Sequence, residues 1–344
     1  MFRQCLLLLS LSVFFCAKAS AQLRENEGAQ KRQPESIKEF SVRHRKQGNA
    51  VMFWNVENLF DCKDDTLKDD ADFQPKGSYR WTPSRYWKKL DNLSRVFAAV
   101  TDECAGWPML VGLAEVENDS VLRDLTRRSP LSIAGFRYVL TEGPDARGID
   151  VGLLYQPSRF ELLSWRAVRV PSEEHGYRPT RDILYVCGRV GVDTLHVLVV
   201  HLPSKSRGGQ ASKKHRRLAV ECVRSMVDSL AQKKVLVMGD FNAEPDEDIF
   251  ETLCPPLQSL MPKERRHLRG RNGTYVFQGQ WGYLDHMLVS ESLFPFIEDG
   301  RARVVKLPFM LNDKGHPWRT YRGPVYEGGY SDHLPLLLQM DRFE

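Results

Sequence analysis

Short apolar runs recur along the chain, and polar stretches or turns separate them. Their length and their Val and Leu content are typical of strands buried on at least one face. Two longer stretches, Trp87–Cys104 and Lys213–Lys233, place apolar residues near helical spacing and charges elsewhere. The mixture predicts an α/β or α+β fold with large sheets. The expected strands are Val51–Asn55, Leu110–Glu115, Val151–Tyr155, Leu195–His201, Val235–Asp240, Asp285–Val289 and Leu334–Met340.

The N-terminus follows a different pattern, which is typical of a secretory signal peptide. Residues 1–21 combine an early basic residue, an apolar run over 6–15 and small residues at 19–21. The run is too short for a transmembrane helix, and no later stretch is long enough, so we expect no stable membrane insertion. We expect export, to the periplasm or the extracellular space if the source is bacterial.

The remaining chain divides into a leader and one domain. Residues 22–48 are polar and without pattern, and we expect a mobile leader there. No internal repeat or Pro/Gly-rich linker divides 49–344. We therefore expect a single domain over these residues, and a monomer.

Charge and cysteine content exclude some classes of protein. The net charge of +5 over 344 residues excludes a purely electrostatic nucleic-acid binder but permits basic patches. An odd number of cysteines without C-x-x-C spacing argues against a zinc site or a disulfide framework, although one disulfide stays open. We expect Cys222 to be a buried free thiol in a helix. The cysteines beyond the signal segment are Cys62, Cys104, Cys187, Cys222 and Cys254.

Polar side chains stand at or beside the ends of the expected strands. One such residue alone is typical of a cap or a turn. Ligands of α/β sheets, however, bind outside the carboxyl ends of strands, so a full set at such places predicts one shared site. The set is Asn55, Glu115, His201, Asp240, Asn242, Asp285, Asp332 and His333.

The residue types in this set limit the chemistry. Oxygen ligands with few nitrogens favour Mg²⁺ or Mn²⁺, with Ca²⁺ as a further option, over zinc. An Asp beside a His orients the imidazole for acid–base work. Asn side chains can hold a phosphate oxygen or a water without adding charge. These are the parts needed for metal-assisted attack of water on a phosphate ester.

An ordered series of motifs then resembles the endonuclease/exonuclease/phosphatase superfamily, which has the deoxyribonuclease I-like fold. The resemblance covers about residues 50–342 and implies a four-layer sandwich, with two central mixed β-sheets flanked by helices and the site at one edge. The motifs are WNVENLFD (54–61), LAEVEN (113–118), RGIDVGLLY (147–155), VHLPSKSRGG (200–209), MGDFNAEP (238–245), LDHMLVS (284–290) and GGYSDHLP (328–335).

The resemblance also implies roles for the metal-binding residues. Glu115 matches the principal metal ligand, Asn55 the metal-site Asn, and Asp332 an Asp near the metal. Ala114 stands where the family usually has Gln before the metal Glu. Glu117 is a rival ligand, and strand alternation would place it on the same side as Glu115.

The other matched positions would carry the reaction. Asp240 and Asn242 match the pair that handles the nucleophilic water and the phosphate. His333 matches the catalytic His, and Asp285 matches the Asp that pairs with it. His201 matches a second His that contacts phosphate or aids protonation.

Three features leave alternatives open. Asp150 is either a structural residue at a turn or strand edge or part of the site. Trp281, Tyr283 and Tyr275 either stack on bases or belong to the core. Two basic segments either line the approach of a polyanionic substrate or are solvated surface. These segments contain Lys205, Arg207, Lys213, Lys214, His215, Arg216 and Arg217, and then Lys263, Arg265, Arg266, His267, Arg269 and Arg271.

Three functions remain. The first is a secreted metal-dependent phosphodiesterase, most simply a nuclease whose partner is nucleic acid. The second is a phosphoesterase for a lipid head group, a nucleotide or an inositol phosphate. Ala243 after GDFN argues against the inositol branch, which has Arg there, and only 307–311 is a candidate for membrane contact. The third is a non-catalytic binding protein, against which the complete set of acids and histidines argues.

Overall fold

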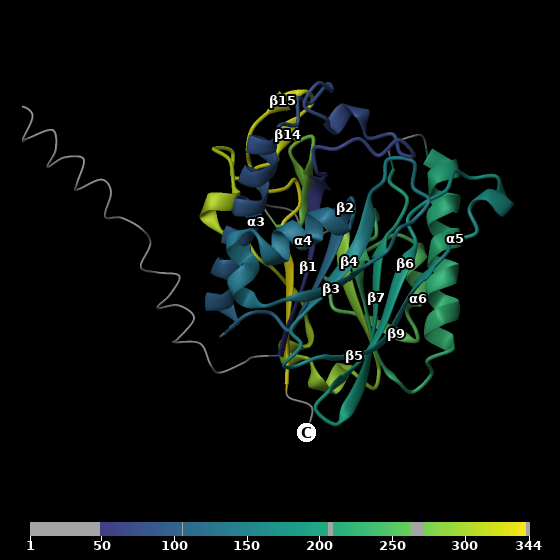
Figure 1. Cartoon of the computed structure of the whole chain (residues 1–344). Coiled ribbons are helices and arrows are strands. Elements are labelled where there is room, and N and C mark those ends of the chain that lie inside the picture. The colour runs from purple at the N-terminus through teal and green to yellow at the C-terminus, as the bar shows by residue number, and fades with distance from the viewer. Residues whose placement is uncertain (1–48, 105, 206–208, 263–271, 342–344) are drawn as a thin grey trace, which may run out of the picture. The chain divides into compact units, whose positions relative to one another are not determined.

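Two six-stranded sheets form the centre of the fold (Figure 1). The computed structural model describes residues 49–104, 106–205, 209–262 and 272–341. In the first sheet the strand order is β13 (Arg303–Val304), β16 (Leu336–Met340), β1 (Asn49–Leu59), β2 (Leu110–Val116), β4 (Asp150–Tyr155) and β3 (Arg137–Leu140). In the second the order is β5 (Glu161–Val168), β6 (Ile183–Val190), β7 (Asp193–His201), β8 (Lys234–Asp240), β12 (Asp285–Ser290) and β9 (Leu257–Ser259).

Smaller elements complete the described part of the chain. Two hairpins stand outside the large sheets, β10 (Tyr275–Phe277) with β11 (Gln280–Gly282), and β14 (Tyr321–Arg322) with β15 (Val325–Tyr326). The α-helices are α3 (Pro83–Glu103), α4 (Asp119–Arg127), α5 (Gly209–Asp228) and α6 (Ile249–Leu253). Short 3-10 helices lie in the connections: η1 (Ala71–Phe73), η2 (Pro130–Ala134), η3 (Glu173–His175), η5 (Phe294–Phe296), η6 (Glu298–Gly300) and η7 (Pro308–Met310). Figure 1 shows α3 and α4 on one side of the sheet pair and α5 and α6 on the other.

Strand β1 shows why the chain folds in layers. Ala50, Met52 and Trp54 are buried in a cluster that contains residues of α3 and α4. Val51 and Phe53 are buried in a second cluster that contains residues of the other sheet. Because successive side chains of a strand face opposite sides, an apolar strand must be covered on both.

Strand β7 repeats this arrangement in the second sheet. Val197 and Val199 face the first sheet, whereas Leu198 and Val200 pack with α5 and α6 in a third cluster. The three clusters are the three interfaces of a four-layer sandwich. Each sheet contains one parallel pair, β1–β2 and β7–β8, among antiparallel ones, so both sheets are mixed. The expected fold class is thereby confirmed.

The strand register brings distant parts of the sequence together at one edge. His201 at the end of β7 is paired with Asp240 at the end of β8. Asp285 at the start of β12 is paired with the same Asp240 from the other side. Three residues that are far apart in sequence therefore stand side by side, and the shared site follows from pairing alone.

Both expected helices are present, with shifted bounds. Thr82 caps α3, its side chain accepting a hydrogen bond from the Arg85 backbone N–H, and Pro83 occupies the first helical turn, so α3 starts before Trp87. Helix α5 ends at Asp228, before the expected Lys233.

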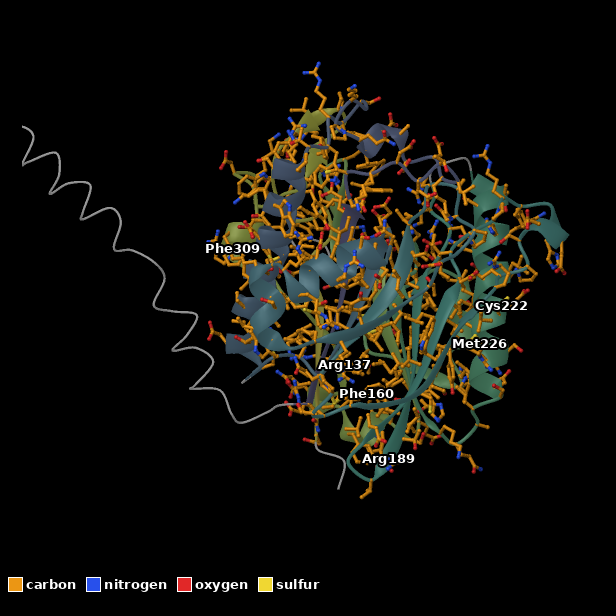
Figure 2. All side chains as sticks on the ribbon, in the orientation of Figure 1. Arg137, Phe160, Arg189, Cys222, Met226 and Phe309 are labelled. Atoms are coloured by element: carbon orange, nitrogen blue, oxygen red, sulfur yellow. The ribbon has the colours of Figure 1, made fainter. Side chains whose placement is uncertain are left out.

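The buried face of α5 also differs from the expected stripe. Its buried residues include Val220, Val223 and Val227, whereas Cys222 is only half-buried (Figure 2). Of the expected stripe of Leu218, Cys222, Met226 and Leu230, only Met226 is fully buried. Residues spaced strictly four apart do not stay on one face of a helix with about 3.6 residues per turn, so the expected stripe of four residues was wrong.

Some predictions find no test in the described residues. The signal segment and the leader lie outside them, as do the basic residues at 207 and 263–271. No disulfide joins the described cysteines at 62, 104, 187, 222 and 254 to one another. Among the described helices none has the length and apolarity needed to cross a membrane.

Candidate active site

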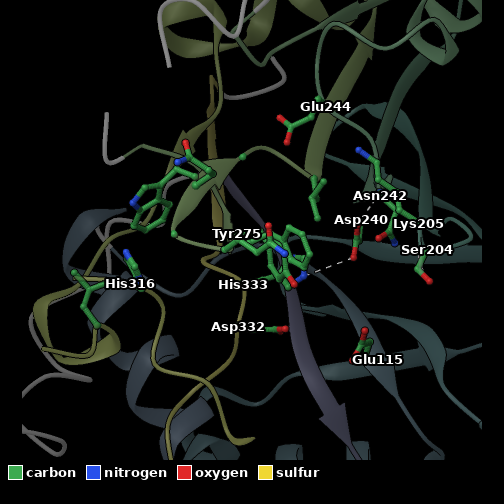
Figure 3. A pocket seen from close by; sticks show the side chains of 18 of the residues that line it. Glu115, Ser204, Lys205, Asp240, Asn242, Glu244, Tyr275, His316, Asp332 and His333 are labelled. Atoms are coloured by element: carbon green, nitrogen blue, oxygen red, sulfur yellow. Dashed lines mark hydrogen bonds and ion pairs between the residues drawn. The ribbon is translucent and has the colours of Figure 1, made fainter. Parts of the chain in front are cut away.

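Six of the eight predicted site residues line one cavity of about 1520 Å³, which Figure 3 shows from close by. Asn55 and Asp285 are not among the lining residues but hydrogen-bond to side chains that are. The fold therefore brings all eight predicted residues into one neighbourhood, whereas the chemical role of each remains a prediction. The predicted residues that line the cavity are Glu115, His201, Asp240, Asn242, Asp332 and His333.

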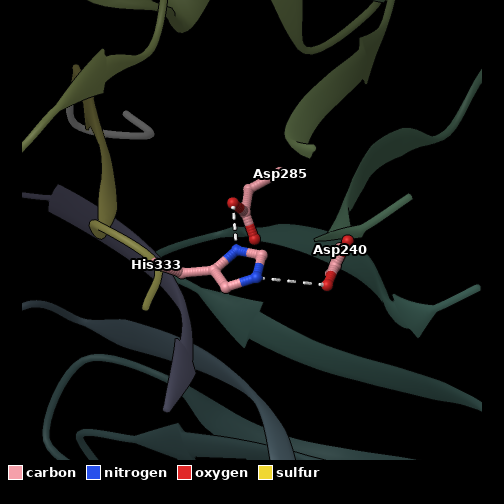
Figure 4. Close-up of side chains that lie close together, drawn as sticks. All are labelled: Asp240, Asp285 and His333. Carbon is pink, nitrogen blue, oxygen red and sulfur yellow. Dashed lines mark hydrogen bonds and ion pairs between the residues drawn. The ribbon is translucent and has the colours of Figure 1, made fainter. Parts of the chain in front are cut away.

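His333 is fixed in one orientation by its neighbours. Its Nδ1–H donates to Asp285 Oδ2 at 2.8 Å, and its Nε2 lies 3.8 Å from Asp240 Oδ2 (Figure 4). The Tyr275 ring packs against the imidazole, with 4.8 Å between centroids. Burial opposes the charged imidazole, but Asp285 and then Asp240 and Asp332 outweigh it and hold the pKa of His333 well above its usual value. The protonated form of His333 is therefore favoured by the acidic side chains on either side of it.

His201 stands on the other side of Asp240 in the opposite state. Its Nε2 lies 3.6 Å from Asp240 Oδ2 and 3.9 Å from Glu115 Oε1. Burial, reinforced by the charges of Arg181 and Arg147, holds the pKa of His201 well below its usual value. The site thus offers one neutral and one charged imidazole across a single carboxylate.

Asp240 is tied into the site through both oxygens. The Asn55 side-chain amide donates to Oδ2 at 3.0 Å, and the Asn242 backbone N–H donates to Oδ1 at 2.9 Å. Burial raises the pKa of Asp240 to about 7, and the charge of Asp285 adds to this. Asn242 has φ of +49°, which Asn tolerates better than most residues, and its side chain donates to the Leu202 carbonyl. A carboxyl with such a pKa can take up a proton near neutral pH.

A bulge in β2 presents Glu115 to the cavity. Its φ is +63°, and the register of β2 shifts on either side of it. The carboxylate accepts from the Asn55 side chain at 3.3 Å and from the Asn58 backbone N–H at 2.8 Å. Glu115 makes no described ion pair with Lys or Arg, so its charge remains directed at the cavity.

The same bulge corrects the expectation for Glu117. Strand alternation would place Glu117 beside Glu115, but the bulge interrupts the alternation between them. The Glu117 carboxylate instead accepts from the Asp61 backbone N–H, and its burial raises its pKa to about 8. Glu117 does not line the cavity. It holds the end of β1 rather than serving as a rival ligand.

Asp332 is held by groups that the sequence did not single out. Arg319 Nη2 lies 3.2 Å from Asp332 Oδ2. Behind this pair, the buried Lys89 donates to Thr320 Oγ1 and to the Tyr330 carbonyl, both at 2.6 Å. These contacts anchor both ends of the segment that leads into the SDH motif.

Glu57 completes this anchor and was also missed. Its carboxylate accepts from the Thr320 backbone N–H and lies 4.0 Å from Lys89 Nζ. Glu57 belongs to the quoted WNVENLFD motif, which was the available signal. Lys89 had no sequence feature that could have identified it, because a Lys on an amphipathic helix is ordinarily exposed to solvent.

The structure decides the open question of Asp150. Its Oδ1 accepts from Thr141 Oγ1 at 2.7 Å and from the Gly143 backbone N–H at 2.8 Å. It is buried, does not line the cavity, and has a pKa raised to about 6 by burial. Asp150 is the first residue of β4, so the expectation of a structural Asp at a turn or strand edge is the one that the contacts support, at the strand edge. The neighbouring Arg147 does line the cavity and was missed.

The first basic segment provides fewer basic side chains to the cavity than its sequence indicates. Lys205 lines the cavity and pairs with Glu247 at 2.6 Å. Arg216 is buried and donates to the Pro203 carbonyl, and the half-buried His215 stacks on Tyr177. These two side chains belong to the scaffold and not to a substrate-facing surface.

The donor set fits a hard divalent cation. Glu115 and Asp332 offer carboxylate oxygens at the cavity. Asn55, expected as a further ligand, instead donates from its Nδ2 to Glu115 while its Oδ1 accepts from the Glu57 backbone N–H, so it positions Glu115. Ligand atoms of Asp240, Asp285 and His333 also lie within 4.8 Å of one another. Their closeness is explained by the hydrogen bond from His333 to Asp285, which a cation there would break. Glu115 is therefore the better centre for a metal.

Comparison with known proteins agrees with this geometry. The endonuclease/exonuclease/phosphatase family model matches residues 50–342. The chain belongs to this family, and the predicted resemblance is confirmed. A comparison with curated proteins found no significant match.

Solved structures share the fold at low sequence identity. D. rerio TDP2 complexed with single strand DNA product is 14% identical, with a TM-score of 0.55 over 85% of this chain and 98% of that one. The human Nocturnin catalytic domain with bound sulfate anion is 17% identical, with a TM-score of 0.52 over 86% and 95%. The Bacteroides thetaiotaomicron VPI-5482 mannosyl-6-phosphatase Bt3783 is 16% identical, with a TM-score of 0.52 over 85% and 98%. At these identities the likeness establishes the fold alone.

Proposed function

We propose that this protein hydrolyses phosphodiester bonds with the help of a divalent cation, and that it is a nuclease. The observation that carries the proposal is the arrangement around Asp240: His333 Nε2 lies 3.8 Å from Asp240 Oδ2 on one side, His201 Nε2 lies 3.6 Å from it on the other, and Glu115, held by Asn55, lines the same cavity. A scaffold or binding protein has no need of two histidines and two carboxylates gathered at one cavity.

The residues divide the work of hydrolysis. Glu115, positioned by Asn55, and Asp332 would hold Mg²⁺ or Mn²⁺, which when bound supplies positive charge to the phosphate. Asn242 orients the attacking water, and Asp240 takes its proton as the oxygen bonds to phosphorus. The bond from phosphorus to the leaving oxygen then breaks, and that oxygen takes up a proton from solvent water, so that an alcohol and a phosphate monoester are released.

The two histidines and their partners handle the phosphate. The imidazolium of His333, oriented by Asp285, donates a hydrogen bond to a phosphate oxygen and offsets the charge that develops. His201, in its neutral form, positions a second oxygen.

Two comparisons bear on the substrate. A TDP2 structure holds a single-stranded DNA product, which favours nucleic acid. The mannosyl-6-phosphatase favours the second candidate, a phosphoesterase for a smaller substrate. Exposed cationic and aromatic groups around the cavity, described below, make nucleic acid the first choice.

The test is a substrate panel on purified protein: plasmid DNA, RNA, bis-p-nitrophenyl phosphate, sphingomyelin, inositol phosphates and a sugar phosphate. We expect hydrolysis of nucleic acid and of bis-p-nitrophenyl phosphate that EDTA abolishes and that His333→Ala or Asp240→Ala removes. Full activity in the His333→Ala protein would refute the mechanism. Hydrolysis of lipid or sugar phosphate but not of nucleic acid would select the second candidate.

We also propose that the protein is exported and that residues 1–21 are its signal. The support is the sequence pattern at the N-terminus. N-terminal sequencing of the protein from its host should find Gln22 first. Recovery of the uncleaved chain from the cytosol would contradict export.

A further inference from the structure

The cavity continues past the catalytic groups along the hairpin β10–β11. Tyr275 forms an isolated bridge with His333, so the hairpin starts directly beside the catalytic imidazole. Phe277, Gln280 and Trp281 of the hairpin also line the cavity. Whatever part of a substrate extends beyond the hydrolysed phosphate on this side must therefore contact the hairpin.

The hairpin exposes an aromatic ring at this wall. Tyr275 and Phe277 are two residues apart on β10, so they share a face. Tyr275 is half-buried against His333, whereas Phe277 is 63% exposed. Packing in the core does not account for the Phe277 ring.

The other aromatic rings named as candidates for base stacking are covered by other residues of the protein. Tyr283 is buried between the two sheets, so it cannot stack on a base. Lys306 Nζ lies 4.2 Å above the Trp281 ring, and the His316 ring contacts the same indole edge-on. Of the aromatic residues at this hairpin, Phe277 is the one that presents an accessible face.

Basic side chains surround the same part of the cavity. Lys306, Lys314 and His316 line it beyond the hairpin. Glu244, a carboxylate that also lines the cavity, accepts from the Tyr283 backbone N–H. An exposed ring combined with cations fits a chain of bases and phosphates better than it fits an uncharged sugar or a lipid.

We propose that Phe277 stacks on a base of an unpaired nucleic-acid strand next to the hydrolysed phosphate, and that Lys314 holds a further backbone phosphate. This inference rests on the proposed function, because it names the substrate of the same site. It also makes single-stranded nucleic acid the preferred substrate, since a base inside a duplex cannot present its face to Phe277.

The test compares two single strands of equal length in the presence of Mg²⁺. One carries normal bases, and the other has abasic residues in their place, so that only the bases differ. We expect Phe277→Ala to raise KM for the base-bearing strand on the order of tenfold and to leave KM for the abasic strand unchanged. Lys314→Gln should raise KM for both strands and reduce the dependence of binding on salt.

Trp165→Ala is the matched control. Trp165 is an aromatic residue of β5 that is 46% exposed and does not line the cavity. Its loss should change neither KM. Thermal unfolding of each variant should match that of the unchanged protein, because all three side chains are partly or largely exposed.

The outcomes separate the two proposals. Cleavage of both strands with no effect of Phe277→Ala, or with an equal effect on both, would overturn the stacking and leave the proposed function intact. Equal or better cleavage of duplex DNA would overturn the preference for an unpaired strand. Hydrolysis of neither strand by the unchanged protein would overturn both proposals.

Discussion

The backbone conformation of single residues decides how the site is presented. Glu115 and Asn242 both have positive φ, and each places its polar group at the cavity. The sequence identified both residues from their position at strand ends. It could not show the bulge at Glu115, because a bulge depends on pairing with β1 and β4 and leaves no periodic signal. The misplacement of Glu117 follows directly from this.

Asp285 provides a test of how His333 is held. Asp285→Asn keeps the shape of the side chain but removes the charge that orients the imidazole and sustains its proton. We expect the rate of phosphodiester hydrolysis to fall on the order of a hundredfold or more, because His333 loses the carboxylate that orients its ring and favours its protonated form. The measurement is kcat on bis-p-nitrophenyl phosphate.

Asp193→Asn is the control for that change. Asp193 pairs with Lys234 at the far end of β7 from His201. The Asp193→Asn protein should retain the full kcat of the unchanged protein. An Asp285→Asn protein with more than half of the original kcat would show that His333 does not depend on this carboxylate.

At the scale of elements, the strands that carry the site were the easiest to predict. Their apolar runs are continuous because both faces are buried. Strand β5 was missed because most of its residues are exposed, as is usual for an edge strand, so it has no buried apolar run. Helix α4 was missed because it has only 9 residues and follows β2 after a short connection. Both lie away from the cavity lining, so the site prediction did not suffer.

Gly239 tests the close pairing of β7 with β8. A Cβ at this position would lie 2.2 Å from the Val200 carbonyl oxygen, which is backbone and cannot turn away. We expect Gly239→Ala to lower the free energy of unfolding by about 2 kcal/mol and to reduce activity, because Asp240 is the next residue. Urea denaturation measures the first effect.

The matched substitution is Gly209→Ala at the start of α5. Its Cβ would meet nothing within 4 Å. Stability should therefore stay the same or rise slightly. Equal free energies of unfolding for Gly239→Ala and Gly209→Ala would show that β7 and β8 can move apart without loss of stability.

At the scale of the whole molecule, the layers follow from the alternation of apolar residues, but the order of the strands does not. Periodicity gave buried strands and two helices, and only the motif resemblance supplied the four-layer arrangement. The contacts of Lys89 with Thr320 and Tyr330 join residues more than two hundred positions apart. Such long-range polar contacts leave no local pattern in a sequence.

Buried His286 makes the stability of the molecule depend on pH. Its Nε2–H donates to the carbonyls of Ala243 and Tyr283, and burial lowers its pKa to about 4. The folded state therefore resists protonation while the unfolded state accepts a proton near pH 6.5, so stability is complete above that pH and is lost as pH falls toward 4. Between about pH 7.5 and about pH 5 this group should cost roughly 2 kcal/mol of stability.

His286→Gln removes the titration, so the difference in unfolding free energy between the two proteins isolates it. The advantage of the unchanged protein over the variant should shrink by that amount as the pH is lowered. A difference that stays constant with pH would mean that His286 does not titrate on unfolding.

The most direct test of the central claim is the Mg²⁺ dependence of phosphodiester hydrolysis in the unchanged protein and in Glu115→Gln. Glu115 is the carboxylate placed at the cavity by the β2 bulge. We expect no hydrolysis in EDTA, recovery on adding Mg²⁺, and a Mg²⁺ requirement at least about tenfold higher in Glu115→Gln, because a neutral amide binds a hard cation more weakly. Hydrolysis that persists in EDTA, or the same Mg²⁺ requirement in both proteins, would contradict the account.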